Sequence, residues 1–490
     1  MLLARMPAAC HHIFNLLNIF ARPRWLAIIF LLCAVPTGLG CALLTPLGVP
    51  PDELAHIARA EGLRLGQITN PPSPINVPGV LVNSGIFDII LAMELEPYAA
   101  RGNVPPAILV QTGAVRWGSQ NWFCTTQMTM YFPVFYLPAA LGLAGGKLAG
   151  LSPLFAIYLA RVCMLLSFMA MGGAALCLAR FGAPLLFVIL TLPTTITLGA
   201  SCSQDGQLIA ACALAVALLT RTAPTRTARV AGGAAWWGAL ALLTAIALAK
   251  FSYVALLLFC LAPLHAPGLA RRAGLVLLAA VAPLLWLLHI HAMGFAPWPF
   301  AAYHPGPLWP GDRSIWLHDA RPSNNLQVLL AHPAEIIRLP FRSLAAQWGG
   351  MWRKILACVS VDVVLMRPWE YPWLALSLIA AALAAPPGAR HWRAWDALLA
   401  WLILLSSFMA IELSLYLTFS QAGANLVSGV QGRYFLLLLP FCALPLSGVL
   451  ARVKPCPPPG LLCLPAVMMA VLNSYVLPSF LYHFFRMAGP

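Results

Sequence analysis

Charged side chains are scarce in this chain, and acidic side chains are the scarcest. Asp, Glu, Lys and Arg make up only 9% of the 490 residues, 61% are hydrophobic, and just 14 are Asp or Glu. A water-soluble globule of this length needs a more polar surface than this composition supplies. The composition excludes a soluble protein and predicts an all-α polytopic integral membrane protein, with membrane lipids as its surroundings.

The chain also lacks the patterns of a nucleic-acid or metal site. Its net charge of +15 comes from Lys and Arg residues scattered at the ends of apolar runs, where such residues set membrane topology. We therefore expect no nucleic-acid partner. No Cys or His pairs have metal-ligand spacing, so no cofactor is certain, and a divalent cation is left open.

Apolar runs of about 20 residues predict transmembrane helices. We expect about eleven of them, at 25–44, 153–178, 183–200, 205–220, 233–249, 251–266, 273–291, 371–386, 396–418, 434–451 and 461–480. Two further apolar stretches, 131–149 and 345–366, are predicted not to cross, because only then do the short Arg-rich connections all face the cytoplasm. We expect residues 131–149 to form a re-entrant or interfacial helix, broken by Pro133 and Pro138.

This topology predicts one membrane-embedded domain over residues 1–490. Residues 1–24 would be cytoplasmic, and three extracytoplasmic loops would span 45–130, 292–370 and 419–433. Twelve of the 14 acidic residues then face outward. Because acidic residues contribute little to topology, we expect their clustering to mark a site on the extracytoplasmic face.

The motif Pro50-Pro51-Asp52-Glu53 follows the first apolar run directly. It predicts a short helix that ends at Gly62 and brings Asp52, His56 and Arg59 near one face, with Glu53 beside them. Helix capping would explain one acid at this position. Capping does not explain the whole set, so we interpret the segment as functional.

Two further charged residues each allow two interpretations. Asp205, in Ser201-Cys-Ser-Gln-Asp205-Gly, either caps a helix or belongs to a site at the rim of the bundle. Lys250 lies in a short turn before Tyr253, where it either extends to the membrane interface or helps to bind an anion.

The segment Gly429-Val-Gln-Gly-Arg-Tyr434-Phe is the second strong motif. Its glycines allow close backbone approach, and Gln431, Arg433 and Tyr434 supply hydrogen-bond donors where a lipid phosphate would lie. The alternative is an Arg-Tyr anchor at the membrane interface.

Together these motifs, with Tyr131-Phe-Pro-Val-Phe-Tyr136 between them, resemble domain-of-unknown-function family 2142 of bacterial membrane proteins. That family is similar to the GT-C superfamily of membrane glycosyltransferases. The likeness implies a GT-C-like helical bundle with Asp52 as catalytic carboxylate, Glu53 as its partner and Asp205 as the second acidic position. Those transferases usually have Arg-Tyr after Asp-Glu, whereas this chain has Leu54-Ala55, so the identity of the base stays open.

The resemblance implies an enzyme of the bacterial plasma (inner) membrane. It would transfer a sugar from a polyprenyl-phosphate donor to a hydroxyl of a glycan, lipid or protein acceptor on the extracytoplasmic face, with inversion. Expected substrate-binding residues are His56, Arg59, Lys250, Gln431, Arg433 and Tyr434. The alternatives are a transporter or flippase for a lipid-linked sugar, whose charges would line a translocation path, and a ligase or polymerase of such sugars.

The topology is testable by cysteine labelling. We expect Ser119→Cys and Ser323→Cys, in a background without other accessible Cys, to react with an impermeant thiol reagent in intact cells. Thr225→Cys should stay unlabelled, because it lies within the Arg cluster at 221–229. Labelling of Thr225→Cys would overturn the topology.

Overall fold

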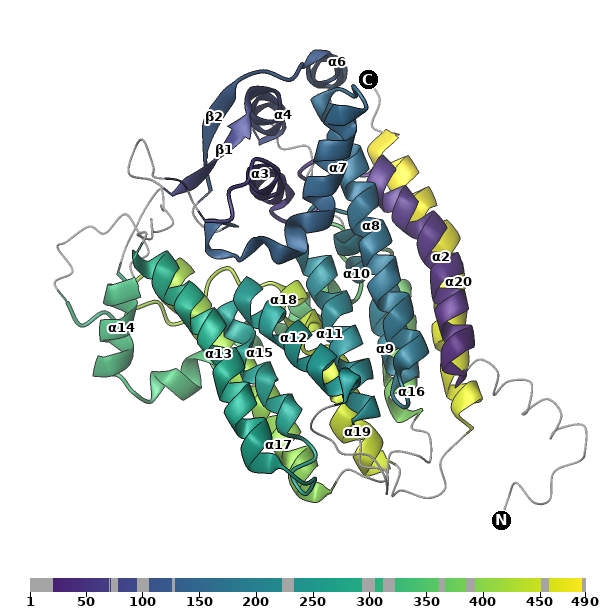
Figure 1. Ribbon diagram of the computed structural model, residues 1–490, viewed down its shortest axis with the longest axis vertical. Helices are drawn as coiled ribbons and strands as arrows, with labels where there is room; N and C mark the ends of the chain where they lie inside the picture. The colour runs from purple at the N-terminus through teal and green to yellow at the C-terminus, as the bar shows by residue number, and fades with distance from the viewer. Residues whose placement is uncertain are drawn as a thin grey trace, which may run out of the picture.

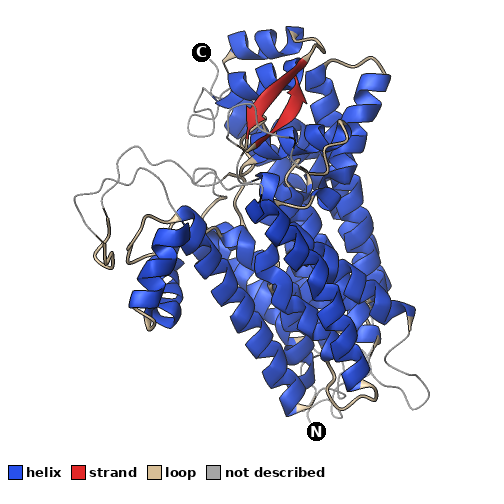
Figure 2. Ribbon diagram, turned by 60° about the vertical axis from the view of Figure 1, so that its left-hand side comes forward, coloured by secondary structure: helices blue, strands red, loops and turns tan. Residues whose placement is uncertain are grey.

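The fold is almost entirely helical (Figures 1 and 2). The computed structural model describes residues 21–69, 71, 78–94, 105–125, 128–222, 233–292, 305–311, 322–360, 366–384, 393–450 and 458–486. Ser119 and Ser323 lie within these ranges and are exposed, whereas Thr225 lies outside them. The helical content agrees with the class predicted from composition.

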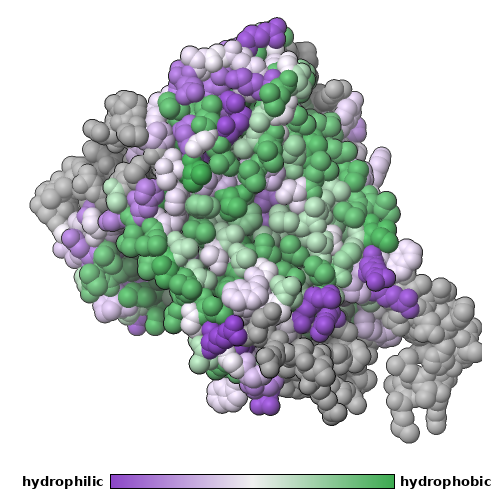
Figure 3. Space-filling view, in the orientation of Figure 1, coloured by the Kyte–Doolittle hydropathy of each residue, from purple (hydrophilic) through white to green (hydrophobic). Residues whose placement is uncertain are grey.

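Long apolar helices form the body of the protein. Among the described residues, five helices have the length and hydropathy to cross a membrane: α2 (Pro23–Leu44), α8 (Pro153–Leu178), α13 (Leu269–Ala292), α17 (Ala394–Phe419) and α20 (Pro459–Arg486). Figure 3 shows their apolar surface as a broad band with hydrophilic residues above and below it. The chain is a multi-pass membrane protein.

A bent pair adds a sixth candidate span. Helices α10 (Pro193–Gly199) and α11 (Gln204–Arg221) meet at 113°. A Cβ at Gly206 would lie 2.4 Å from the backbone nitrogen of Gly199. Only glycine permits this approach, which places the first turn of α11 directly against α10.

The predicted count of about eleven spans is not confirmed. Several predicted spans correspond to shorter helices, because prolines such as Pro193 and Pro440 interrupt their hydrogen-bond ladders. These helices are α9 (Ala183–Thr191), α12 (Ala234–Ala249), η5 (Phe251–Leu261), α16 (Glu370–Leu383), α18 (Gly432–Leu436), η7 (Leu439–Cys442) and α19 (Ala443–Leu450).

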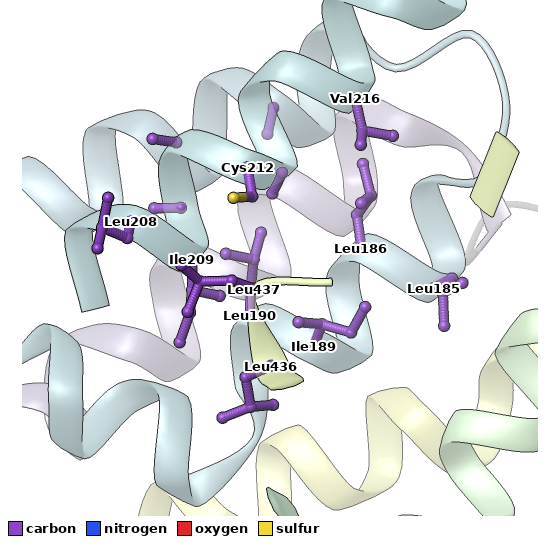
Figure 4. Packing of buried hydrophobic residues seen from close by; sticks show 14 of the residues in the cluster. Leu185, Leu186, Ile189, Leu190, Leu208, Ile209, Cys212, Val216, Leu436 and Leu437 are labelled. Carbon is purple, nitrogen blue, oxygen red and sulfur yellow. The ribbon is translucent and has the colours of Figure 1, made fainter. Parts of the chain in front are cut away.

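The core of the bundle is made by aliphatic residues of α9, α11 and α18. Figure 4 shows Leu186 and Leu190 of α9 beside Ile209 and Cys212 of α11. All four are fully buried, as is Leu436 of α18. Between membrane helices such side chains stabilise the fold through close van der Waals packing, and this packing holds the start of α11 and the start of α18 in fixed positions.

The first loop folds into a separate layer at the top of Figure 1. It contains α3 (Glu53–Arg64), β1 (Gly79–Asn83), α4 (Ser84–Glu94), α6 (Pro106–Ala114), β2 (Gln120–Cys124), η3 (Met128–Met130), η4 (Pro133–Tyr136) and α7 (Leu137–Leu148). Strands β1 and β2 pair antiparallel, with Leu81 opposite Trp122. The all-α prediction contained no such ribbon. The Gln67 side chain holds it by exchanging two 2.9 Å hydrogen bonds with the Leu81 backbone.

The stretches predicted not to cross also form helices. Residues 131–149 contain η4 and the twelve-residue α7, which packs along α8. The second loop contains α14 (Pro322–Ala331) and α15 (Glu335–Leu356), and α15 begins ten residues before the predicted stretch at 345. Neither α7 nor α15 is among the described helices long and apolar enough to cross a membrane.

Several chain segments that were predicted to be cytoplasmic meet at the lower end of the bundle. Arg22 and Arg180 line one pocket together with Ala384, which follows α16, and Pro459, the first residue of α20. These element ends therefore lie close together. Most of the predicted connection at 221–229 falls outside the described residues.

Candidate functional site

Four charged residues from distant parts of the chain form one network. Asp52 precedes α3, Asp205 lies in the first turn of α11, Lys250 joins α12 to η5, and Arg433 lies in α18. Lys250 Nζ lies 2.5 Å from Asp205 Oδ1, and Arg433 Nη1 lies 3.3 Å from Asp205 Oδ2. Arg433 Nη2 donates to Asp52 Oδ2, and Nη1 donates to the carbonyl of Pro51 at 3.0 Å.

Asp52 is the exposed member of this network. Its side chain is 36% exposed, against 4% for Arg433 and 8% for Lys250. Asp52 stands at the N-cap of α3 with φ +57°, and its side chain accepts no capping hydrogen bond. The capping alternative is therefore wrong for Asp52.

The charge state of Asp52 follows from its surroundings. Partial burial tends to raise its pKa, but the charge of Arg433 and the hydrogen bond from it hold the pKa below the ordinary value. Asp52 is thus a carboxylate at neutral pH, able to accept a proton.

Lys250 is buried within the protein, where its ammonium group pairs with Asp205. Its ammonium group stands 5.2 Å from the ring centroid of Tyr131 and 5.0 Å from that of Tyr434. The Tyr253 hydroxyl donates to the Tyr434 carbonyl at 2.8 Å. The faces of these two rings and the Asp205 carboxylate together stabilise the buried charge of Lys250.

Asp205 is not itself the cap of α11. Ser203 caps α11 by accepting a hydrogen bond from the Asp205 backbone nitrogen at 3.3 Å. The carboxylate is thereby left to Lys250, and its Oδ2 makes no hydrogen bond. Its position at the head of the helix follows from capping, and its side chain belongs to the charge network.

Glu53 points elsewhere, although it is adjacent to Asp52. Its carboxylate accepts hydrogen bonds from Arg161 Nε at 2.8 Å and Arg161 Nη2 at 2.5 Å, and from the backbone nitrogens of Gly48 and Cys202, both at 3.1 Å. Glu53 and Arg161 are both fully buried. With four acceptor positions filled, Glu53 has no capacity left for a substrate.

Arg161 is the residue that sequence reasoning missed. Beyond its two bonds to Glu53, it donates to the carbonyls of Ala42, Thr45 and Pro46 at 2.9, 2.6 and 3.1 Å. All five of its N–H groups are used, which fastens the corner between α2 and α3 to α8. The signal was present in the sequence, because Arg161 is the one charged residue in the 26 residues of α8.

His56 and Arg59 separate in the structure. The Nδ1 of His56 lies 2.6 Å from the Tyr136 hydroxyl, and burial lowers the pKa of His56 to about 4 despite the nearby charges of Asp205 and Asp52. Arg59 instead donates to the carbonyls of Gln67, Ile68 and Tyr131. His56 thus lies beside the network as a neutral ring, whereas Arg59 supports the loop layer.

A narrow pocket lies beside Arg433, and Gln431 is one of the residues that line it. Its cavity volume is only about 20 Å³, and it is lined by Pro51, Thr194, Thr197, Leu198, Lys354, Cys358, Ser360, Gln431, Gly432 and Arg433. Among the residues that the structure describes, this lining includes Lys354 and Arg433 and no acidic residue. The arrangement suits an anion next to a partly exposed carboxylate.

The donor set fits a divalent cation poorly. Among the described residues, no group of three or more His, Cys, Asp or Glu side chains has metal-binding geometry. Asp52 and Asp205 already face Arg433 and Lys250, so their negative charge is balanced by the protein itself.

The chain belongs to a known family. Residues 35–442 match the family described as predicted membrane protein (DUF2142). Neither curated proteins nor solved structures supply a match. The family therefore establishes a membrane protein, and the chemistry has to be argued from the site.

The buried pair predicts a stability effect that separates Glu53 from Asp52. Glu53→Gln leaves the Arg161 charge buried without its counterion, which should cost about 3–5 kcal/mol of stability and lower the melting temperature in detergent. The exposed Asp88→Asn is the matched control and should melt like the parent. Parent-like melting of Glu53→Gln would contradict the structural role.

His56 predicts a pH dependence. Its folded-state pKa of about 4 lies below its ordinary value of 6.5, so the unfolded chain takes up the proton first. Stability should therefore fall as pH drops from 6.5 towards 4, and His56→Gln should flatten this part of a melting profile. His483→Gln, at an exposed position of α20, is the control and should keep the parent slope. An unchanged slope in His56→Gln would refute the assignment.

Proposed function

We propose that this protein is an integral membrane glycosyltransferase that moves a sugar from a polyprenyl-phosphate donor to an acceptor hydroxyl on the extracytoplasmic side of the bacterial inner membrane. One observation carries the proposal: the buried Arg433 contacts the exposed carboxylate of Asp52 and also lines the anion-compatible pocket. A base and a phosphate-binding group are thus adjacent.

Asp52 has the role of general base in this proposal. Its carboxylate takes the proton of the acceptor hydroxyl as that oxygen bonds to the anomeric carbon of the sugar. The bond from the anomeric carbon to the phosphate oxygen breaks, and its electron pair stays on the phosphate. A single displacement of this kind inverts the anomeric configuration.

Arg433 stabilises the phosphate that leaves. Its guanidinium is held by the Pro51 carbonyl and by Asp205, so it is positioned before the reaction begins. Lys250 neutralises Asp205, and His56 adds a neutral ring beside the carboxylates. Tyr434 and Gln431 are the remaining residues that bind the sugar donor in this proposal.

Glu53 is a positioning residue in this proposal. Asp52 directly precedes Glu53 in the chain. The buried pair of Glu53 with Arg161 therefore determines where the Asp52 carboxylate points. We expect the effect of Glu53 on transfer to come through the placement of Asp52 and not through contact with substrate.

One observation favours the alternative of a transporter for a lipid-linked sugar. Glu412 is fully buried within α17, and neither of its carboxyl oxygens has a hydrogen-bond partner in the described structure. Intramembrane carboxyls often serve ion or substrate pathways. A transporter would lose activity on Glu412→Gln, whereas the proposed transferase would keep its sugar transfer.

Asp52→Asn is the decisive variant. Asn tolerates φ +57° and nearly matches Asp in size, and Asp205 remains as a counterion 3.3 Å from Arg433, so the protein should keep its fold and melt close to the parent. Transfer should fall by about 10²–10⁴, because an amide cannot take the proton. The measurement is transfer from a radiolabelled pool of lipid-linked sugars to the cell's own glycans, with Asp88→Asn as control. Full transfer by Asp52→Asn would remove Asp52 as the base.

A further inference from the structure

Helix α15 differs from the spanning helices because its polar and apolar residues lie on different faces. Successive residues of an α-helix are turned by about 100° around its axis. Ile337, Phe341 and Trp348 therefore share one narrow apolar stripe. Their side chains are 64%, 46% and 53% exposed. The described structure thus leaves this stripe open to the surroundings of the protein.

The side of α15 next to the stripe is basic. Arg338 and Arg342 each follow a stripe residue directly, so both lie on the same side of the stripe, about 100° further round the helix. Both residues are exposed. Glu335, the one acidic residue in the sequence of α15, pairs with Arg342 at 2.7 Å. The charge of Arg338 is therefore not balanced by an acidic residue of this helix.

A third face of α15 is fixed to the loop that follows α17. The Gln347 side chain donates to the Val427 carbonyl at 2.9 Å, and Ser343 Oγ accepts from the Val427 backbone nitrogen at 2.8 Å. Arg342 Nε donates to the Asn425 carbonyl at 2.7 Å. Because these bonds prevent rotation of the helix, the apolar stripe stays turned outward.

The contacts of α15 place it at the edge of the membrane. Helix α17 is long and apolar enough to cross the membrane and ends at Phe419, so the loop with Val427 lies beyond the span. The ring of Phe341 packs against Phe408, which lies within the span, with centroids 5.6 Å apart. A helix that contacts both the span and the loop beyond it lies where hydrocarbon meets headgroups.

We propose that α15 lies in the membrane interface and binds the phosphate group of an anionic phospholipid through Arg338 and Arg342. The apolar stripe lies among acyl chains, and the two guanidinium groups lie at the level of the phosphates. Arg suits this role because its paired N–H groups match phosphate oxygens. Arg342 is already positioned by Asn425 and Glu335. This lipid site does not depend on the proposed sugar transfer.

The position of the stripe is tested by spin labelling in lipid bilayers. Ile337→Cys and Trp348→Cys, each in the full chain without other accessible Cys, receive a nitroxide label. We expect frequent collisions with oxygen and few with a water-soluble nickel chelate, because acyl chains exclude the chelate. Ala346→Cys is the matched control, since it is exposed on the same helix about 160° away from Trp348. Nickel access at 337 and 348 equal to that at 346 would overturn the proposal.

Lipid selectivity is measured at Trp348 itself. The full chain is reconstituted in phosphatidylcholine that contains a small fraction of brominated phosphatidylglycerol or of brominated phosphatidylcholine. The fluorescence of Trp348 is obtained as the difference between the parent and Trp348→Phe. We expect brominated phosphatidylglycerol to quench this fluorescence with a relative affinity about fivefold higher, because basic residues near the surface attract anionic lipids.

Arg338→Gln should remove most of this preference and still melt like the parent, because Arg338 is exposed. Arg338→Lys keeps the charge and should keep most of the preference. Arg116→Gln removes an exposed Arg of the loop layer and is the control, which should select lipid like the parent. An unchanged preference in Arg338→Gln, or an equal loss in Arg116→Gln, would show that α15 has no anionic-lipid site.

Discussion

The buried ion pair between Glu53 and Arg161 is the constraint on which the site depends. It joins the end of α2, the start of α3, the middle of α8 and the link before α11 through hydrogen bonds that use every donor and acceptor of the two groups. Two charges in a low-dielectric interior are tolerated only when satisfied in this way. The pair therefore fixes the backbone between α2 and α3. The direction of the Asp52 side chain depends on this fixed backbone.

The neighbouring network follows a different rule. Asp52, Asp205, Lys250 and Arg433 balance to zero net charge, but Asp205 Oδ2 and Arg433 Nε have no hydrogen-bond partner in the described structure. Such unsatisfied groups cost free energy and usually have a functional reason. The two adjacent acids thus have different roles. Glu53 is buried and all of its hydrogen-bond acceptor positions are filled. Asp52 is exposed and pairs with Arg433, which a ligand could bind in its place.

Much of the site was predictable from single motifs, because each motif stands at the end of an apolar helix. Asp52, Asp205, Lys250 and Arg433 were all singled out on that ground, and the structure brings them together. Arg59 was assigned by helical spacing alone, and it lies elsewhere because the turn at 67–68 supplies carbonyls for it. Spacing along one helix predicts the face on which a side chain lies. It does not predict which groups of other segments will bind that side chain.

The sequence by itself determined that this is a helical membrane protein, because hydrophobic runs and scarce charge leave no other solvent for the chain. It also predicted that most of the acidic residues lie at one end of the helices. Only the tertiary structure decided which acid is held and which is exposed, since that depends on Arg161 and Arg433, about 108 and 381 residues away from their partners along the chain. It also decided which face of α15 stays exposed, because Ser343 and Gln347 on another face bond to Val427 of a distant loop.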